Sequence, residues 1–578
     1  MKASDYIVSY LAQNGVDVVF GYIGGMITHL VDSLGKSDEV RFVQTYHEQT
    51  ASMAAEGYAL ESGKIGVAIA TSGPGATNMA TGIADAYFGN IPVLYITGQV
   101  NTYEYKYDKP IRQQGFQETD VVSIVKPITK YAVMVDKPEN LCFELEKAIH
   151  IATTGRKGPV LIDLPMNISR VDINPEQMRH YEPETPQKSQ IDISLLADAL
   201  SKAKYPMVLV GGGCIDAREE VDAFVRKYNL PVVVSLMGKG IVDETYENYL
   251  GMIGSYGNRC ANLSFAKVDL LIALGSRLDT RQTGAKIDGF VPNGKIIHVD
   301  IDGNELKCHR ILNRILFNTD VSAFLTQVLQ ADMAFSTSLG WIEWLQQIKQ
   351  KYSQEQEVAR FVSNKAPYMV MQELNKITKQ GDIITADIGQ NQMWAAQTIA
   401  MKPNQRFVTS GGLAPMGFSL PVAIGMAFAN PSKAIYCITG DGGLHMAVQS
   451  LLLISQYKLN IKVIVMNNSV LGMITQFQHL YFDSRMYATT QQGGYILPSL
   501  EDIAKAYNLP YYQVDGSCPC FKQELQKGGC IVDCLIGEST VVSPKLEYDK
   551  PIYNMLPLLD DGEIKFLCSQ LDANEDCL

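Results

Sequence analysis

Two apolar segments that each end in a short polar motif constrain the fold of this chain more than any other feature. The first, residues 434–439, runs into Gly440-Asp441-Gly442, and the second, residues 461–466, closes on Asn467-Asn468. Asn468 lies 27 residues past Asp441, about the length of one strand–helix–strand unit. Both motifs are therefore expected at the carboxyl ends of neighbouring parallel strands, the edge at which open α/β sheets bind ligands. Carboxylate and amide oxygens suit Mg²⁺ carrying a diphosphate, and glycines let the backbone approach the phosphates.

The length and charge of the chain exclude several classes of protein. A chain of 578 residues is too long for one hydrophobic core, so three or four domains are expected. The net charge of −12 argues against a nucleic-acid surface and against binding to anionic membranes. The N-terminus leads straight into an amphipathic helical pattern, and no apolar run is long enough to cross a bilayer. We therefore expect a cytoplasmic protein.

The cysteines indicate a reducing compartment. Their number, 11, is odd, and their spacing is irregular, which is typical of reduced thiols. Cys518, Cys520, Cys530 and Cys534 offer a zinc site as an alternative. That alternative is disfavoured because Cys534 lies inside the strand-like run 531–536.

Alternating strand and helix patterns predict an α/β fold with three doubly wound parallel-sheet domains. The first domain, 1–180, has its strands predicted at 18–20, 41–45, 66–70, 93–96 and 160–163. The second, 194–335, opens with a helix at 195–204 and continues with strands at 207–210, 270–274 and 296–301. The third, 366–542, begins with a strand at 383–387 and contains both polar motifs. The first and third domains share this pattern and flank the second.

Three segments separate or end these domains. Residues 181–193 are polar and bear prolines, so they are expected to form a linker. Residues 331–364 have a charged helical pattern. The tail, 543–578, is acidic and punctuated by prolines, and we expect it to be a surface-crossing arm that ends in a short helix.

Glu48 lies at another predicted strand end, between the strand 41–45 and a helix at 49–60. Taken alone, it is an acid favoured by the helix dipole. Together with the metal motif, His47-Glu48-Gln49 resembles the second half of the site of thiamine-diphosphate-dependent enzymes. Their chemistry needs a carboxylate on the aminopyrimidine ring, so that the ring can remove a proton from the thiazolium carbon.

The resemblance is most extensive to the acetolactate synthase large subunit family, and it covers nearly the whole chain. The matching stretches, in order, are Phe20-Gly21-Tyr22-Ile23-Gly24-Gly25, His47-Glu48-Gln49, residues 70–78, Ile96-Thr97-Gly98-Gln99, Phe116-Gln117-Glu118-Thr119, residues 158–163, Gly389-Gln390, Gln392-Met393-Trp394 and Leu471-Gly472-Met473. Each stretch is modest alone, but their shared order is specific. The first and third domains would then bind the pyrimidine and the diphosphate, on either side of a central nucleotide-fold domain.

This resemblance implies roles for individual residues. Asp441, Asn468 and the backbone carbonyl of Val470 would bind Mg²⁺. Glu48 would activate the ring, and Gln117 would face the reacting carbon. Met416 would be the apolar wedge that bends the cofactor. Further contacts to thiamine diphosphate are implied for Ala414, Gly440, Gly442, Gln390 and Met473.

The central domain resembles the flavin-binding region of the same family. The implied FAD contacts are Arg156, Gly212, Gly254, Gly257, Arg277 and Asp300, and the flavin would be mainly structural. Gly211-Gly212-Gly213 is not a complete Gly-x-Gly-x-x-Gly fingerprint. A nicotinamide site is therefore poorly supported.

The acceptor side departs from the family pattern. Phe477 stands where many acetolactate synthases have Trp, Met166 replaces a typical Lys, Asn391 replaces a common His, and Pro415 replaces a Thr. Residues 112–115 and the tail also differ, and Phe116 remains on this side of the site. The donor half of the site is thus retained and the acceptor half altered.

The resemblance implies decarboxylation of pyruvate and carboligation of the two-carbon unit to a second 2-keto acid. One alternative is a carboligase of the same family with another carbonyl acceptor, such as a ketosugar. Another is a catalytically silent regulatory subunit, which the joint presence of Glu48, Asp441 and Asn468 argues against. A homodimer or homotetramer is expected, with Glu48 of one chain facing the diphosphate site of another, and a small regulatory subunit is a possible partner.

Overall fold

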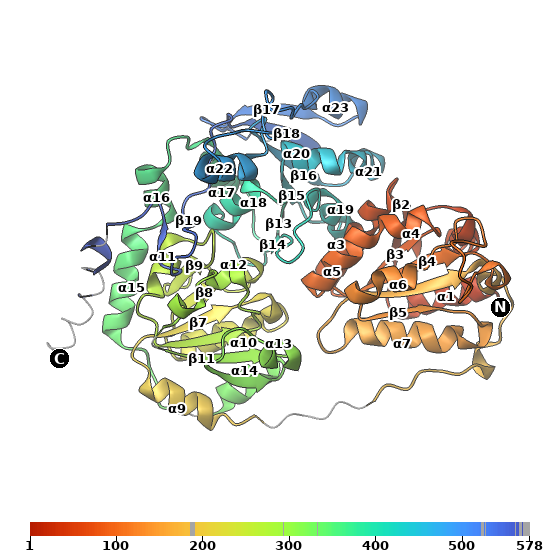
Figure 1. Ribbon diagram of the computed structural model, residues 1–578, viewed down its shortest axis with the longest axis horizontal. Helices are drawn as coiled ribbons and strands as arrows, with labels where there is room; N and C mark the ends of the chain where they lie inside the picture. The colour runs from red at the N-terminus through yellow and green to blue at the C-terminus, as the bar shows by residue number, and fades with distance from the viewer. Residues whose placement is uncertain are drawn as a thin grey trace.

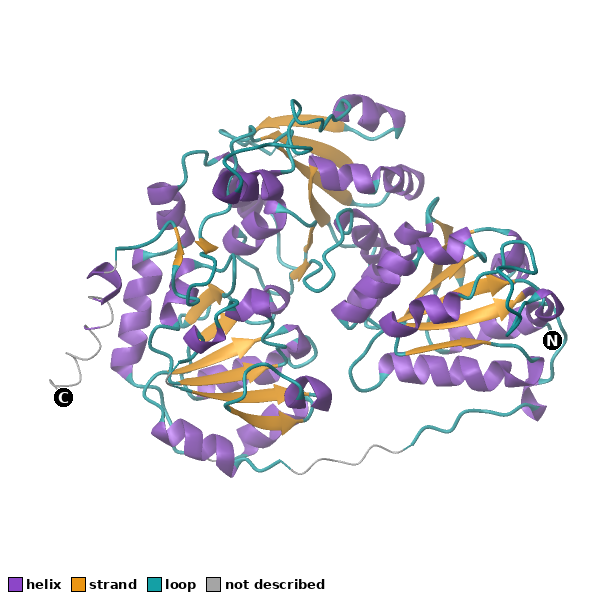
Figure 2. Ribbon diagram, viewed as in Figure 1, coloured by secondary structure: helices purple, strands orange, loops and turns teal. Residues whose placement is uncertain are grey.

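Three six-stranded parallel sheets follow one another along the chain (Figure 1). The computed structural model describes residues 1–184, 191–292, 294–331, 333–521, 525, 528–560, 562–565 and 569. Helices cover both faces of each sheet, as expected for doubly wound domains (Figure 2). The predicted fold class is therefore confirmed.

The first and third sheets have the same strand order. The first runs β2-β1-β3-β4-β6-β5, and the third runs β14-β13-β15-β16-β18-β17, which is the same order counted from β13. The strands of the first sheet are β1 Val18–Tyr22, β2 Arg41–Gln44, β3 Gly66–Ala70, β4 Val93–Gln99, β5 Tyr131–Met134 and β6 Val160–Pro165. Those of the third are β13 Ile383–Ala386, β14 Arg406–Val408, β15 Ile435–Gly440, β16 Ile461–Asn467, β17 Tyr511–Asp515 and β18 Cys530–Leu535.

The middle sheet has a different order, β12-β11-β10-β7-β8-β9. Its strands are β7 Pro206–Val210, β8 Val232–Val234, β9 Tyr249–Met252, β10 Leu270–Leu274, β11 Lys295–Asp300 and β12 Arg314–Asn318. The helices nearest the sites described below are α3 Glu48–Ser62, α4 Pro74–Asn78, α5 Ala80–Gly89, α8 Met166–Ser169, α18 Gln390–Thr398, α19 Ser419–Ala429, α20 Asp441–Met446 and α22 Gly472–Tyr481. The charged stretch 331–364 contains α15 Leu339–Lys351 and α16 Gln354–Phe361, as its pattern predicts.

Helices α3 and α19 join the first and third sheets into one hydrophobic core. A Cβ added at Gly57 would lie 2.0 Å from the carbonyl oxygen of Val422, and one added at Gly425 would lie 1.8 Å from that of Ala54. Only glycine permits this approach of the two backbones. Because the later residue of α19 meets the earlier residue of α3, the two helices run antiparallel.

The tail is more deeply packed than its composition predicts. Ile552 and Met555 are buried, and Leu546 donates its backbone N–H to the carbonyl of Ser255 at 2.7 Å. Strands β19 Lys545–Leu546 and β20 Met555–Leu556 form a small antiparallel sheet. The predicted surface-crossing arm is thus more buried than its composition suggests, because apolar residues between the prolines pack against the middle segment. Residues 562–565 are helical, and the rest of the predicted terminal helix, like linker residues 185–190, lies outside the described residues.

A buried carboxyl group in the first sheet predicts a pH-dependent stability. Asp163 on β6 accepts hydrogen bonds from Thr97 Oγ1 at 2.7 Å and Gln99 Nε2 at 2.8 Å, and burial raises its pKa to about 7. A pKa above the ordinary 3.8 means that the folded state binds the proton more tightly than the unfolded state does. Through this group, the free energy of unfolding therefore falls as pH rises from about 4 to 7. We expect Asp163→Asn to flatten this dependence in urea unfolding, and exposed Asp38→Asn to leave it unchanged. An equal slope in the parent and Asp163→Asn would contradict the prediction.

Candidate active site

The two polar motifs meet at the carboxyl edge of the third sheet. Asp441 directly follows β15, Asn468 directly follows β16, and these strands are parallel neighbours with Gly440 beside Met466. Asp441 is 3% exposed. It accepts backbone hydrogen bonds from Gly442 to Oδ1 and from Ser469 to Oδ2, each at 2.7 Å. The carboxylate thereby ties the two predicted metal-binding loops together.

The donors at this edge fit a hard cation. Asn468 is held by Nδ2 donating to Thr540 Oγ1 at 3.0 Å, and its Oδ1 accepts the backbone N–H of Val470 at 3.3 Å. Burial raises the pKa of Asp441, against hydrogen bonds that lower it, and a bound cation would favour the charged form. One carboxylate with amide and carbonyl oxygens suits Mg²⁺ that completes its shell with phosphate oxygens and water.

The described part of the chain contains no group of three or more His, Cys, Asp or Glu residues placed to hold a metal. This applies to the alternative zinc site, where Cys518 and Cys520 are exposed and Cys530 and Cys534 are buried. Zinc held by these thiols is therefore not supported.

The predicted wedge lies beside the glycine motif. A Cβ added at Gly442 would lie 3.4 Å from Met416 Cε, so the glycine leaves room next to the methionine. Ala414 has a positive φ of 61°, and its backbone N–H donates to Ser410 Oγ at 2.9 Å. A Cβ at Gly440 would lie 3.2 Å from Asn391 Nδ2. These residues form a cradle bordered by the Asp441 carboxylate, which fits a diphosphate.

Two other predicted cofactor contacts are engaged with protein neighbours. Gln390 accepts a hydrogen bond from Thr540 Oγ1 at 2.7 Å and donates to Gln476 Oε1 at 2.9 Å. The sulfur of Met473 accepts a hydrogen bond from the Tyr256 hydroxyl at 3.2 Å, which links α22 to the middle segment. Both residues border the metal loops, and their side chains also hold those loops in place.

Glu48 begins α3 at the end of a loop after β2, as predicted. The residue is 8% exposed, and its Oε2 accepts a hydrogen bond from Asn78 Nδ2 at 2.9 Å. A Cβ added at Gly75 would lie 3.2 Å from Oε1, so this oxygen faces a space that the glycine leaves open. Gln117 adjoins the loop between β3 and α4. It has a positive φ of 64°, and its carbonyl oxygen would lie 3.0 Å from a Cβ added at Gly73.

Glu48 and the Met416 cradle lie toward opposite ends of α3 within one chain. Val422 of α19 packs against Gly57 in the second half of α3. Helix α19 begins at Ser419, three residues after Met416, so the cradle adjoins the end of α3 near Leu60. Leu60 is 12 residues after Glu48, and 12 residues span about 18 Å of helix. The antiparallel packing of α3 on α19 sets this arrangement.

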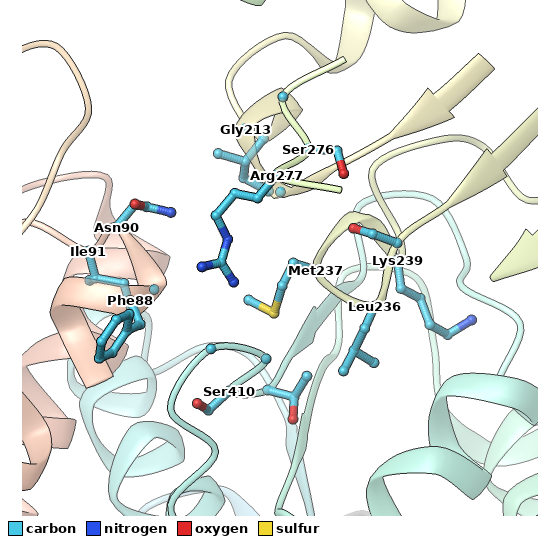
Figure 3. A pocket seen from close by; sticks show the side chains of 18 of the residues that line it. Phe88, Asn90, Ile91, Gly213, Leu236, Met237, Lys239, Ser276, Arg277 and Ser410 are labelled. Atoms are coloured by element: carbon cyan, nitrogen blue, oxygen red, sulfur yellow. The ribbon is translucent and has the colours of Figure 1, made fainter. Parts of the chain in front are cut away.

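A second site lies where the three segments meet (Figure 3). A cavity of about 390 Å³ is lined by Phe88, Asn90 and Ile91 of the first segment, by glycine-rich loops of the second, and by residues 406–412 of the third. Four of the predicted flavin residues line it: Arg156, Gly212, Arg277 and Asp300. Gly254 and Gly257 do not, although Ile253, Ser255 and Tyr256 beside them do.

The loops of this cavity fit a large, anionic ligand. A Cβ added at Gly211 would lie 2.2 Å from the carbonyl oxygen of Gly275, so the two glycine loops touch. Gly254 has a φ of 116°, and a Cβ there would lie 2.5 Å from the Arg281 carbonyl oxygen. The glycine therefore allows the backbone at residue 281 to pack closely against the loop that carries Ser255 and Tyr256. The Arg277 side chain reaches into the space between Asn90 and Met237 (Figure 3). A cation among close-packed backbone loops is the arrangement expected for a dinucleotide diphosphate.

Arg156, which lines the cavity, is also paired with neighbouring side chains. Its Nη1 pairs with Asp302 at 2.9 Å and Glu305 at 2.8 Å, and its Nε donates to Asn90 Oδ1 at 2.6 Å. It therefore bridges the first and middle segments at the rim of the cavity. These contacts use the Nε and Nη1 atoms of the guanidinium.

Comparison with known proteins decides the family. Three family models match the chain: the N-terminal TPP binding domain of thiamine pyrophosphate enzymes at residues 1–124, their central domain at 193–328, and their C-terminal TPP binding domain at 387–528. The chain belongs to the thiamine pyrophosphate enzymes.

Curated relatives narrow this assignment. The acetolactate synthase large subunit of Lactococcus lactis is 36% identical over 528 residues, which cover 89% of this chain and 88% of the relative. The isozyme 1 large subunit of Escherichia coli is 36% identical over 85% of this chain and 86% of the relative. A probable acetolactate synthase large subunit of Methanocaldococcus jannaschii is 38% identical over 84% and 83%. The chain thus belongs to the acetolactate synthase large subunit family, which confirms the resemblance found in the sequence.

The predicted acceptor residues of this acetolactate synthase-family chain lie on different segments. Phe477 lies on α22, half-exposed, with its ring centroid 4.6 Å from that of Tyr481 and 6.0 Å from that of Phe482. Met166 begins α8, directly after β6, and Phe116 is exposed beside Gln117. All three side chains are thus at least partly exposed to solvent.

Sequence reasoning missed two residues, one at each site of this thiamine pyrophosphate enzyme. Tyr495 donates its hydroxyl to Asp441 Oδ1 at 3.0 Å, and burial and that carboxylate raise its pKa, so the hydroxyl keeps its proton. Lys239 lines the cavity and pairs with Glu244 at 3.1 Å. Neither residue belongs to a motif that marks it.

Among the helices of the described residues, none is long and apolar enough to cross a membrane.

Proposed function

We propose that this chain uses thiamine diphosphate and Mg²⁺ to decarboxylate pyruvate and to join the two-carbon unit to a second 2-keto acid. The observation that carries the proposal is the pairing of Asp441 and Asn468 at one sheet edge, in a chain whose other thiamine-binding segment holds a buried Glu48. A binding-only protein has no need for this second carboxylate, which disfavours the silent subunit.

Each residue then has a defined task. Asp441, Asn468 and the Val470 carbonyl would bind Mg²⁺, and Gly440 and Gly442 would leave room for the diphosphate. Met416 and Ala414 shape the cradle, and Gln390 and Met473 hold its border. Glu48 holds and moves a proton at the aminopyrimidine ring, and Gln117 orients the substrate. The cofactor, when bound, supplies the electron sink that decarboxylation requires.

Two copies of the chain build one site in this proposal. Glu48 and Met416 lie toward opposite ends of α3, so the Glu48 of one chain would serve the cradle of a second chain. A two-fold dimer forms two equivalent sites of this kind, and a tetramer forms four. The names of the relatives as large subunits also suggest a small regulatory subunit.

We further propose FAD as a structural ligand of the cavity between the three segments. Its loops and Arg277 support this assignment, and Arg156 lines the same cavity while it bridges the first and middle segments. Domain limits of 1–180, 194–335 and 366–542, with a tail at 543–578, follow the three sheets. A cytoplasmic location suits the reduced cysteines.

Product analysis tests the reaction. The protein is incubated with ¹³C-labelled pyruvate, with and without ketosugars, and the products are identified by mass spectrometry. The proposal expects labelled 2-acetolactate from pyruvate alone. A labelled product only with a ketosugar would favour the alternative carboligase, and absence of any product with bound cofactor would favour the silent subunit.

The acceptor pocket predicts modest selectivity. Phe477 is smaller than the Trp of many family members, and Met166 lacks the cation that could meet an acceptor carboxylate. One extra methylene on a substrate changes its transition-state binding free energy in such a pocket by only about 1–3 kcal/mol. We therefore expect 2-ketobutyrate to be only weakly preferred over pyruvate. In competition assays, Phe477→Trp should raise the preference for 2-ketobutyrate. A strong preference in the parent that Phe477→Ala leaves unaltered would show that Phe477 lies outside the pocket.

A further inference from the structure

The segment between α22 and α23 Leu500–Ala506 returns over the proposed metal loops. The backbone N–H of Leu471 donates to the carbonyl of Thr489 at 2.9 Å, so this segment is bonded to the loop that carries Asn468. A second bond, from the N–H of Tyr495 to the carbonyl of Thr490 at 2.9 Å, closes a turn. The turn directs the Tyr495 side chain at the neighbouring loop.

The Tyr495 hydroxyl reaches the centre of the site. It lies 3.0 Å from Asp441 Oδ1, and a Cβ added at Gly442 would lie only 2.6 Å from it. The glycine of the Gly440-Asp441-Gly442 motif thus also makes room for this tyrosine. The side chain is partly buried, and it comes from 54 residues further along the chain than its partner.

The Asp441 carboxylate is oriented mainly by backbone groups. Gly442 N–H donates to Oδ1 and Ser469 N–H donates to Oδ2, and both belong to the loops that the carboxylate joins. Within the described residues, Tyr495 provides the only side-chain hydrogen bond to this carboxylate. Its hydroxyl restrains rotation of the carboxylate about the bond to Cβ from outside those loops.

We propose that Tyr495 is a positioning residue for the metal ligand Asp441. The inference rests on the proposed function, because it assigns Asp441 to Mg²⁺. The hydroxyl holds the carboxylate in one orientation before the metal binds. The carboxylate therefore loses less conformational entropy when it binds the metal. Groups that hydrogen-bond a metal ligand in this way commonly change metal affinity by about 10–100-fold when removed.

The test replaces Tyr495 by Phe, which removes one oxygen and keeps the ring. The Mg²⁺ concentration that half-saturates thiamine diphosphate binding is measured by calorimetry, and Mn²⁺ binding by electron paramagnetic resonance. We expect the midpoint to rise about 10-fold. Turnover should recover when Mg²⁺ is raised, which a general loss of packing would not allow. The matched control is Tyr487→Phe, in the same segment but 75% exposed, and it should leave the midpoint unchanged.

Two outcomes would overturn the inference. An unchanged midpoint would show that the hydroxyl is not needed, and a lower midpoint would show that it competes with the metal for Asp441. Equal thermal unfolding of the metal-free parent and Tyr495→Phe checks that the fold is kept. If the packing is disturbed, Tyr495→His, which retains a donor, should restore part of the Mg²⁺ affinity that Tyr495→Phe loses. Asp441→Ala is measured in parallel: if that variant still binds cofactor with Mg²⁺, the proposed metal site itself has failed.

Discussion

Glu48→Gln is expected to lower turnover by about 100-fold or more, the usual scale for losing an acid–base group. The amide keeps the shape of the carboxylate and can still contact Asn78, but it cannot exchange a proton with the aminopyrimidine ring. Carboxylate Oε1 faces the space beside Gly75, where a ring nitrogen can approach without meeting a side chain. The loss should therefore appear in turnover, with cofactor affinity changing little.

The measurement is the steady-state rate of product formation from pyruvate at saturating thiamine diphosphate and Mg²⁺. Glu39→Gln, an exposed glutamate of the same segment, is the matched control and should match the parent. A turnover of Glu48→Gln within a few-fold of the parent would show that another group activates the ring.

Asp441→Ala is expected to abolish Mg²⁺-dependent retention of thiamine diphosphate. The substitution removes the one charged metal ligand, and hard-oxygen sites lose their cation when such a ligand is removed. It also leaves the N–H groups of Gly442 and Ser469 without their acceptor, which costs about 1–3 kcal/mol of stability for the buried Gly442. The fold should survive because the β15–β16 pairing does not depend on this side chain.

Calorimetry with and without Mg²⁺ provides the measurement for this variant. Asp483→Ala, a substitution of an exposed aspartate, should keep the affinity of the parent. Cofactor binding by Asp441→Ala that matched the parent would remove Asp441 from the metal site.

The positions of Asp441 and Asn468 could be predicted from the sequence because they depend on local pattern. Apolar runs before Asp441 and Asn468 mark strand ends, and a spacing of one strand–helix–strand unit makes those strands parallel neighbours. The same reasoning places Glu48 at the end of β2. The shared pattern of the first and third segments likewise appears as an identical strand order.

Other contacts could not be predicted because they join residues far apart in the chain through ordinary side chains. Tyr495 meets Asp441 across 54 residues, and Arg156 meets Glu305 across 149 residues, without a motif at either end. The packing of Ile552 in the tail was hidden by the surrounding prolines and charges, which locally predict an exposed segment. The antiparallel contact of α3 and α19 depends on Gly57 and Gly425, and single glycines within helices carry no sign of their partner.

The central claim is that Glu48 and Asp441 belong to one thiamine diphosphate site built by two copies of the chain. Its most direct test mixes two inactive variants, Glu48→Gln and Asp441→Ala, co-expressed with different tags and purified through both. Each mixed dimer would contain one site with both native residues, so 2-acetolactate formation should return to roughly half of the parent rate per dimer. Mixed dimers that form and bind the cofactor but remain as inactive as either variant alone would contradict the claim.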